Sequence, residues 1–125
     1  MADVVETVRS YLRLMEARDL EAASAHLADG VTIVFPGGRT FTNLAEQVAS
    51  SAGRFSKVTK KFERFDVASD GERDVVYVFG TLAGQALDGN AFDGIRFIDR
   101  FVVEGDLIVS QMVWNDLAES GVLSP

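Results

Sequence analysis

Hydrophobic residues recur with helical spacing along the first half of the chain. Val4 and Val8 begin the first such face, and three helices are preceded by residues that commonly cap helix N-termini, Asp3, Asp19 and Asn43. In chain order, the pattern predicts a helix over residues 4–17, a helix over 20–28, a short strand over 31–35 and a helix over 44–52.

Beyond residue 53 the hydrophobic period shortens to the alternation typical of β-strands. Asp88-Gly89 and Glu104-Gly105-Asp106 separate strand-like segments, and Asp-Gly between such segments is a strong hairpin signal. Helices followed by an antiparallel meander define an α+β domain whose helices pack on one face of a curved sheet. The predicted strands cover residues 57–68, 75–87, 92–103 and 107–115.

Composition narrows the class of protein without changing this fold. The chain has 125 residues, which suits a single domain over 1–125, and its net charge of −7 argues against nonspecific nucleic-acid binding. The basic run from Lys57 to Arg64 is interpreted as a solvated strand face. No cysteine, signal peptide or long apolar segment occurs in the sequence, so we expect a cytoplasmic protein that does not bind membranes.

Two segments carry a resemblance to a known family, "YLRLMEARDLEAASAHLADGVTIVFPGG" and "RFIDRFVVEGDLIVSQMVWNDL". Their order and spacing resemble the NTF2-like superfamily, in its SnoaL-like and ketosteroid-isomerase-like branch. The resemblance implies a cone-shaped fold, with N-terminal helices packed in the concave face of a strongly curved antiparallel sheet. It also implies an apolar pocket at the open end and a homodimer formed through the outer sheet face.

Asp99 is a carboxylate in the middle of an apolar strand face that includes Phe97 and Phe101. Burial there would raise its pKa, and a neutral carboxylic acid can donate a hydrogen bond to an oxyanion, as in ketosteroid isomerase. The resemblance places Asp99 at the oxyanion-hole acid and Tyr11 at the oxyanion-hole tyrosine, so both are candidate catalytic residues. Alternatively, Asp99 forms a structural ion pair with an arginine such as Arg96, and Tyr11 is a core residue.

The general base of the isomerase branch is absent, because Phe35 stands at its position and cannot accept a proton. On the last strand, alternation puts Gln111, Val113 and Asn115 on one face, which the resemblance favours as the inner face. Trp114 is a further pocket candidate, although it also fits a core or interface position. The candidate pocket residues are therefore Phe35, Phe97, Phe101, Gln111, Val113, Trp114 and Asn115.

These features predict a protein with a small-molecule pocket. We expect it to be an enzyme that acts on an apolar, carbonyl-bearing substrate. Its reaction would be an isomerisation, cyclisation or dehydration without a cofactor. A non-catalytic ligand-binding or protein-interaction domain is the alternative, and the missing base favours it. His26 is the only histidine and no cysteine accompanies it, so no metal site is expected.

Overall fold

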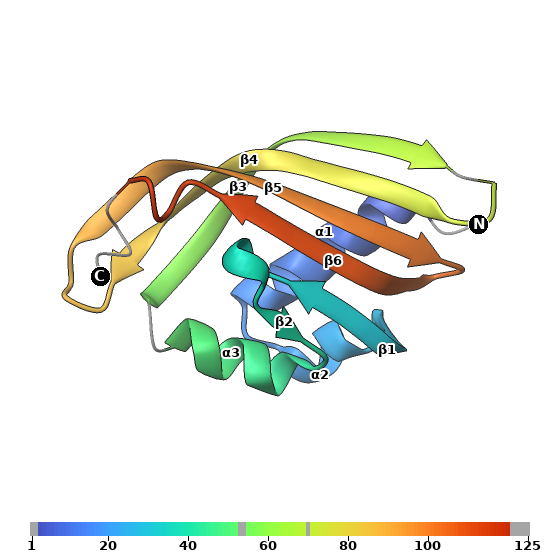
Figure 1. The fold of residues 1–125 in the computed structure, drawn as a ribbon, viewed down its shortest axis with the longest axis horizontal. Coiled ribbons are helices and arrows are strands. Elements are labelled where there is room, and N and C mark those ends of the chain that lie inside the picture. The colour runs from blue at the N-terminus through green and yellow to red at the C-terminus, as the bar shows by residue number, and fades with distance from the viewer. Residues whose placement is uncertain (1–2, 53–54, 70, 121–125) are drawn as a thin grey trace.

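A computed structural model describes residues 3–52, 55–69 and 71–120 of the chain. Its elements follow the predicted order of helices first and long strands afterwards (Figure 1). They are α1 (Val4–Glu16), α2 (Leu20–Ser24), β1 (Leu27–Val34), the 3-10 turn η1 (Pro36–Gly38), β2 (Thr40–Phe41), α3 (Leu44–Ala52), β3 (Phe55–Ser69), β4 (Asp74–Ala86), β5 (Ala91–Glu104) and β6 (Leu107–Asn115).

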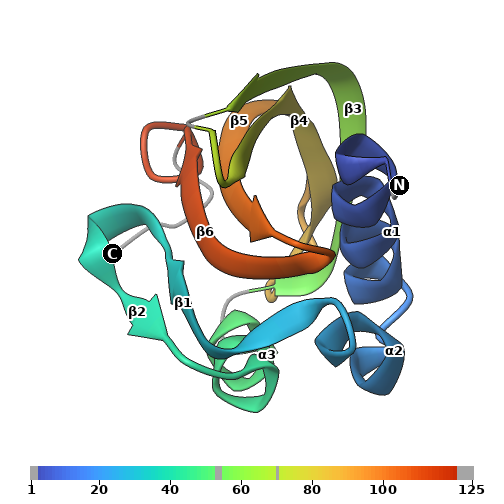
Figure 2. The same ribbon diagram turned by 90° about the vertical axis from the view of Figure 1, so that its right-hand side faces the viewer.

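Six strands form one curved sheet in the order β2-β1-β6-β5-β4-β3. Figure 2 shows this sheet curling around an interior, with α1 alongside β3 and with α3 below the strands. All neighbouring strands are antiparallel except β1 and β6, which pair in parallel. The interior is filled by a single cluster of buried residues from the helices and the concave sheet face. The α+β, cone-shaped architecture expected from the sequence is confirmed.

The second helix is shorter than its sequence pattern predicts. It ends at Ser24, and β1 already begins at Leu27, so the predicted helix over 20–28 is wrong in its second half. The cause is pairing with β6: Leu27 lies opposite Ile108, whose backbone N–H donates to the carbonyl oxygen of His26 at 2.8 Å. Contacts between residues about eighty positions apart therefore override the local helical signal.

The predicted helix caps are present. The side chain of Asp3 accepts a hydrogen bond from the N–H of Val5 at 2.9 Å, and Asp19 accepts one from the N–H of Ala22 at 3.2 Å. Asn43 accepts from the N–H of Glu46 at 3.0 Å. Each bond satisfies a backbone donor that the first helical turn leaves without a partner.

Strands β3 and β4 approach each other closely at Gly80. The register between them shifts between Phe62 and Arg64, opposite this glycine. A Cβ atom at Gly80 would lie 2.0 Å from the carbonyl oxygen of Lys61 and 2.9 Å from a ring carbon of Phe97. Only glycine therefore fits between the β3 backbone and the Phe97 ring.

The outer face of the sheet carries large apolar side chains. Ile98 on β5 lies opposite Trp114 on β6, and these residues are 37% and 47% exposed. This is the face through which a homodimer is expected, and that expectation stays a prediction. None of the helices in the described part of the chain has the length and apolar character needed to cross a membrane.

Candidate functional site

A cavity of about 190 Å³ opens between the helices and the concave face of the sheet. Most of its wall is apolar and comes from α1, β3, β4 and the segment after β1, with Leu12, Met15, Phe35, Phe41, Val58 and Leu82 among the contributing residues. Polar side chains reach the same wall at a few points, namely Tyr11, Glu16, Arg18, Arg39, Gln47, Lys60, Gln111 and Asn115. An apolar wall with a few polar groups is typical of small-molecule sites.

The strongest electrostatic feature is an ion pair between Lys60 on β3 and Asp99 on β5. The Nζ atom of Lys60 lies 2.6 Å from Oδ2 of Asp99, and the side chains are 19% and 0% exposed. Cross-strand neighbours of the carboxyl group are Val78 and Val113. Within the described residues its second oxygen, Oδ1, has no hydrogen-bond partner. Burial raises the pKa of Asp99, while the charge and hydrogen bond of Lys60 act in the opposite direction.

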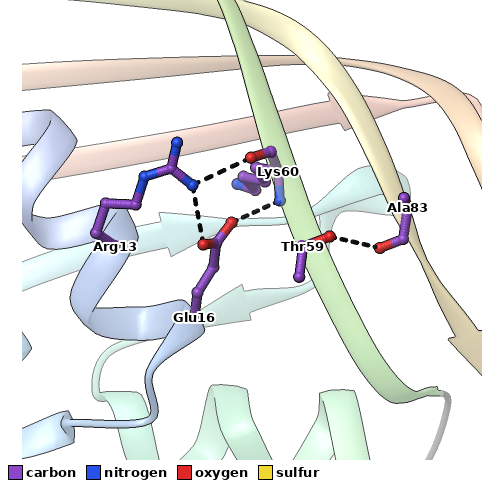
Figure 3. Close-up of polar contacts among 5 residues, drawn as sticks. All are labelled: Arg13, Glu16, Thr59, Lys60 and Ala83. Carbon is purple, nitrogen blue, oxygen red and sulfur yellow. Dashed lines mark hydrogen bonds and ion pairs between the residues drawn. The ribbon is translucent and has the colours of Figure 1, made fainter.

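Two side chains from the last turn of α1 bind the backbone N–H and carbonyl groups of Lys60 from the same side of β3 (Figure 3). Glu16 Oε1 accepts a hydrogen bond from the backbone N–H of Lys60 at 2.5 Å. Arg13 donates to the carbonyl oxygen of Lys60 at 3.2 Å and to Glu16 Oε2 at 2.9 Å. Because β3 is an edge strand, these backbone groups have no neighbouring strand to pair with. The arrangement fixes the point on β3 from which the lysine side chain enters the cavity.

Tyr11 is buried in α1 and lines the cavity. Its hydroxyl group donates to Oε1 of Gln111 at 3.4 Å, and its ring meets Phe101 edge-on at a centroid distance of 5.9 Å. Burial is the main cause of a raised pKa for Tyr11, and the negative charge of Asp99 adds to it. The hydroxyl group therefore stays protonated and acts as a hydrogen-bond donor at any pH near neutrality.

The structure brings only some of the predicted pocket residues to the cavity. Tyr11, Phe35, Gln111 and Asn115 line it. Three others, Phe97, Phe101 and Val113, are buried in the sheet without lining it. Trp114 lies outside the cavity wall on the outer face, because strand alternation turns it away from Gln111 and Asn115. Asp99 lies behind Lys60 and is also not part of the wall.

Lys60 is a cavity residue that the sequence interpretation does not identify. The basic run around it was expected to be solvated, and that interpretation is wrong at this position. Asp99 pairs with this lysine and not with an arginine, the partner that the structural alternative named, and Arg96 pairs with Asp116 at 2.5 Å. One signal was available: alternation puts Lys60 on the same strand face as the apolar Val58 and Phe62.

We expect Tyr11→Phe to destabilise the fold by about 1 kcal/mol, because it leaves the buried Oε1 of Gln111 without its donor. Tyr77→Phe is the matched control. The hydroxyl group of Tyr77 accepts a hydrogen bond from Arg100 at 3.4 Å and is less buried than that of Tyr11. Removing the Tyr77 hydroxyl group should therefore lower the free energy of unfolding by less. Urea unfolding of the two variants gives the comparison, and equal destabilisation would contradict a structural role for the bond from Tyr11 to Gln111.

A family model for the SnoaL-like domain matches residues 8–111. The chain therefore belongs to the SnoaL-like domain family. The comparison with curated protein sequences found no match.

Several solved structures share the fold over most of their length. An NTF2-like protein of unknown function from Burkholderia pseudomallei K96243 is 23% identical, with a TM-score of 0.82 and full coverage of both chains. TerC, crystallised with polyporic acid, is 19% identical with a TM-score of 0.78, and 95% of each chain is covered. A protein of ketosteroid isomerase-like fold from Catenulispora acidiphila DSM 44928, in complex with trimethylamine, is 15% identical with a TM-score of 0.72, covering 90% of this chain and 86% of the other. At these identities the matches establish the fold alone.

Proposed function

We propose that this protein binds an apolar small molecule bearing a carbonyl group in the cavity and promotes its reaction through an enol-like intermediate. Isomerisation, cyclisation and dehydration all belong to this class. The observation that carries the proposal is the position of Lys60: its cationic head group enters a mostly apolar cavity and is held there by a fully buried carboxyl group. A fixed positive charge in a water-poor site stabilises negative charge that develops on a carbonyl oxygen.

The charges along the cavity wall support an electron-rich ligand group. Among the described residues, Arg18, Arg39 and Lys60 contribute to the wall, against the single carboxylate of Glu16. The chain as a whole carries a net charge of −7, so this local excess of cations runs against the overall balance. Such a wall favours a carbonyl or acidic oxygen over a cationic group.

Tyr11 and Asp99 take different roles under this proposal. The hydroxyl group of Tyr11 lies in the cavity wall and can turn from Gln111 to a ligand oxygen as a second donor. Asp99 acts through Lys60 by fixing its head group, which makes it a positioning residue. This assignment replaces the direct contact between Asp99 and substrate that the sequence suggested.

Non-catalytic ligand binding is the second candidate, and Phe35 favours it. This residue lines the cavity at the position where the isomerase branch carries its base, and it packs edge-on against Phe41 at a centroid distance of 5.6 Å. The cavity is then an aromatic-walled binding site with a cation at one point. Loss of the base leaves recognition intact while removing proton abstraction.

A small methyl ketone with a phenyl group, 4-phenylbutan-2-one, serves as the test ligand in deuterated buffer. We expect NMR chemical-shift changes at Tyr11, Leu82 and Asn115, together with exchange of the protons next to the carbonyl group faster than in buffer alone. Binding with no added exchange would favour the second candidate. Shift changes confined to the outer sheet face would contradict both candidates.

Two aromatic truncations provide the matched comparison. Phe35→Ala removes an aromatic group from the cavity wall, and we expect it to weaken ketone binding about tenfold, which corresponds to about 1.4 kcal/mol. Trp114→Ala removes a larger ring from the outer face and should leave the affinity unchanged. Equal effects of the two variants would mean that the ligand does not occupy the cavity.

A further inference from the structure

Lysine is rare in this chain and confined to one short segment. Its three lysines are Lys57, Lys60 and Lys61, all within strand β3. Lys60 and Lys61 are sequence neighbours, but alternation along the strand sends their side chains to opposite faces. Lys60 enters the cavity and Lys61 is exposed. Within the described residues, Lys60 is thus the lysine whose amine lies in the apolar cavity, and its sequence neighbour Lys61 is exposed to solvent.

The surroundings of the Lys60 amine also suit a nucleophile. Its Nζ atom lies 2.6 Å from Asp99 Oδ2 and 4.8 Å from the centroid of the Phe97 ring. Oδ1 of Asp99 has no hydrogen-bond partner within the described residues, so the carboxyl group is only half satisfied. Burial raises the pKa of Asp99, which makes this carboxyl group a better proton acceptor than a solvated one. An amine whose proton can pass to a neighbouring base is able to attack a carbonyl carbon.

We propose that Lys60 forms a covalent imine with an aldehyde or ketone bound in the cavity, with Asp99 accepting and returning one of its protons. This inference rests on the proposed function, because it requires a carbonyl-bearing ligand in the same cavity. It makes the reaction class more specific: an iminium group attracts electrons from the adjacent carbon and so performs the activation that an oxyanion hole provides otherwise.

The atoms of this step balance without an added reagent. The nitrogen lone pair forms a bond to the carbonyl carbon after one ammonium proton has passed to Asp99, and the carbonyl π electrons move to oxygen. Once the carbon–nitrogen bond has formed, two protons of the original ammonium group pass in turn from the nitrogen to the adjacent oxygen, and Asp99 returns its proton to the nitrogen between these two transfers. The carbon–oxygen bond then breaks and water leaves. The third proton remains on the nitrogen of the protonated imine, so the total charge is unchanged.

The backbone contacts at Lys60 support this role. Glu16 and Arg13 hold its N–H and carbonyl groups at 2.5 and 3.2 Å, so the strand cannot slide along α1 without breaking both bonds. Gly80, which lies opposite Phe62, brings the β3 backbone at Lys61 close to the Phe97 ring. The amine is therefore presented from a fixed backbone to a fixed carboxyl group, as a reacting group requires.

The test traps the imine by reduction. The intact protein is incubated with 3-phenylpropanal and sodium cyanoborohydride at near-neutral pH, digested and mapped by mass spectrometry. We expect the 3-phenylpropyl group on Lys60 to exceed that on Lys61 by at least about tenfold, since proximity to a bound carbonyl raises the effective concentration. Labelling of Lys60 equal to or below that of Lys61 would overturn the proposal.

Two variants and a second ligand distinguish failure of the covalent step from failure of the proposed function. Lys60→Arg keeps the positive charge but cannot form the imine, so selective labelling should disappear. Asp99→Asn should slow labelling of Lys60 while leaving that of Lys61 unchanged. If 4-phenylbutan-2-one binds in the cavity and Lys60 is not selectively trapped, the covalent step is wrong and the proposed function stands. If the ketone does not bind and no selective trapping occurs, both are wrong.

Discussion

Replacing Lys60 by methionine should destabilise the protein by about 3–5 kcal/mol near neutral pH, which is the usual cost of leaving a buried charge without its partner. Asp99 is fully buried, its Oδ2 atom bonds to Lys60, and its Oδ1 atom has no partner within the described residues. Without the lysine, the carboxylate would have valine neighbours on both adjacent strands. Urea unfolding at several pH values provides the measurement.

The pH dependence of this loss has a definite sign. Burial raises the pKa of Asp99 in the folded state, and removing Lys60 takes away the contacts that lower it. A folded-state pKa above the unfolded value of about 3.9 means that the native protein binds the proton more tightly. The contribution of Asp99 to stability is then fully present below the unfolded pKa and is lost as the pH rises through the folded pKa. The variant should therefore recover toward wild type as the pH falls.

Two further variants make the experiment decisive. Lys61→Met changes an exposed lysine on the same strand and should alter the free energy of unfolding by no more than about 0.5 kcal/mol. The double variant Lys60→Met with Asp99→Leu replaces the whole pair by apolar groups and should regain most of the lost stability. If Lys60→Met were no more destabilising than Lys61→Met at neutral pH, the buried ion pair would be absent in solution.

Gly80→Ala should cost about 3 kcal/mol, at the upper end of the range for overpacked interiors. The added Cβ would lie 2.0 Å from a backbone oxygen of β3, and a backbone atom cannot move aside as a flexible side chain can. The strand that carries Lys60 would have to shift, so selective trapping at Lys60 should fall together with stability. Chemical unfolding and the labelling experiment measure the two effects on the same sample.

Thr81→Ala is the control for this substitution. It changes the next residue of β4, outside the close approach, and the β-sheet preference of threonine over alanine sets its cost at about 1 kcal/mol or less. Similar losses for Gly80→Ala and Thr81→Ala would mean that β3 and β4 are farther apart at this point than described.

The sequence predicts the elements of this fold well because their signals are local. Capping residues mark the helix starts, and alternation with Asp-Gly turns marks the long strands. The exception is the segment from Ala25 to Ala28, where parallel pairing of Leu27 with Ile108 overrides a helical pattern. That pairing depends on two segments far apart in sequence, which no local pattern contains.

The candidate site was only partly predictable for the same reason. Burial of Asp99 follows from its apolar neighbours on the strand, and it is fully buried. Its partner could not be read from the sequence, because Lys60 reaches it diagonally across the sheet from a run of charges that normally face water. The division of the aromatic residues between the cavity wall and the core likewise depends on the curvature of the whole sheet.

The hydrogen bonds from α1 to the backbone of Lys60 also affect how readily the edge of the sheet pairs with another molecule. An edge strand exposes unpaired N–H and carbonyl groups, and these can recruit a strand from another molecule into a growing sheet. Arg13 and Glu16 occupy both groups at the middle of β3, and they carry opposite charges that an incoming apolar strand would have to displace. The contacts that position the cavity lysine therefore also protect the sheet from edge-to-edge aggregation.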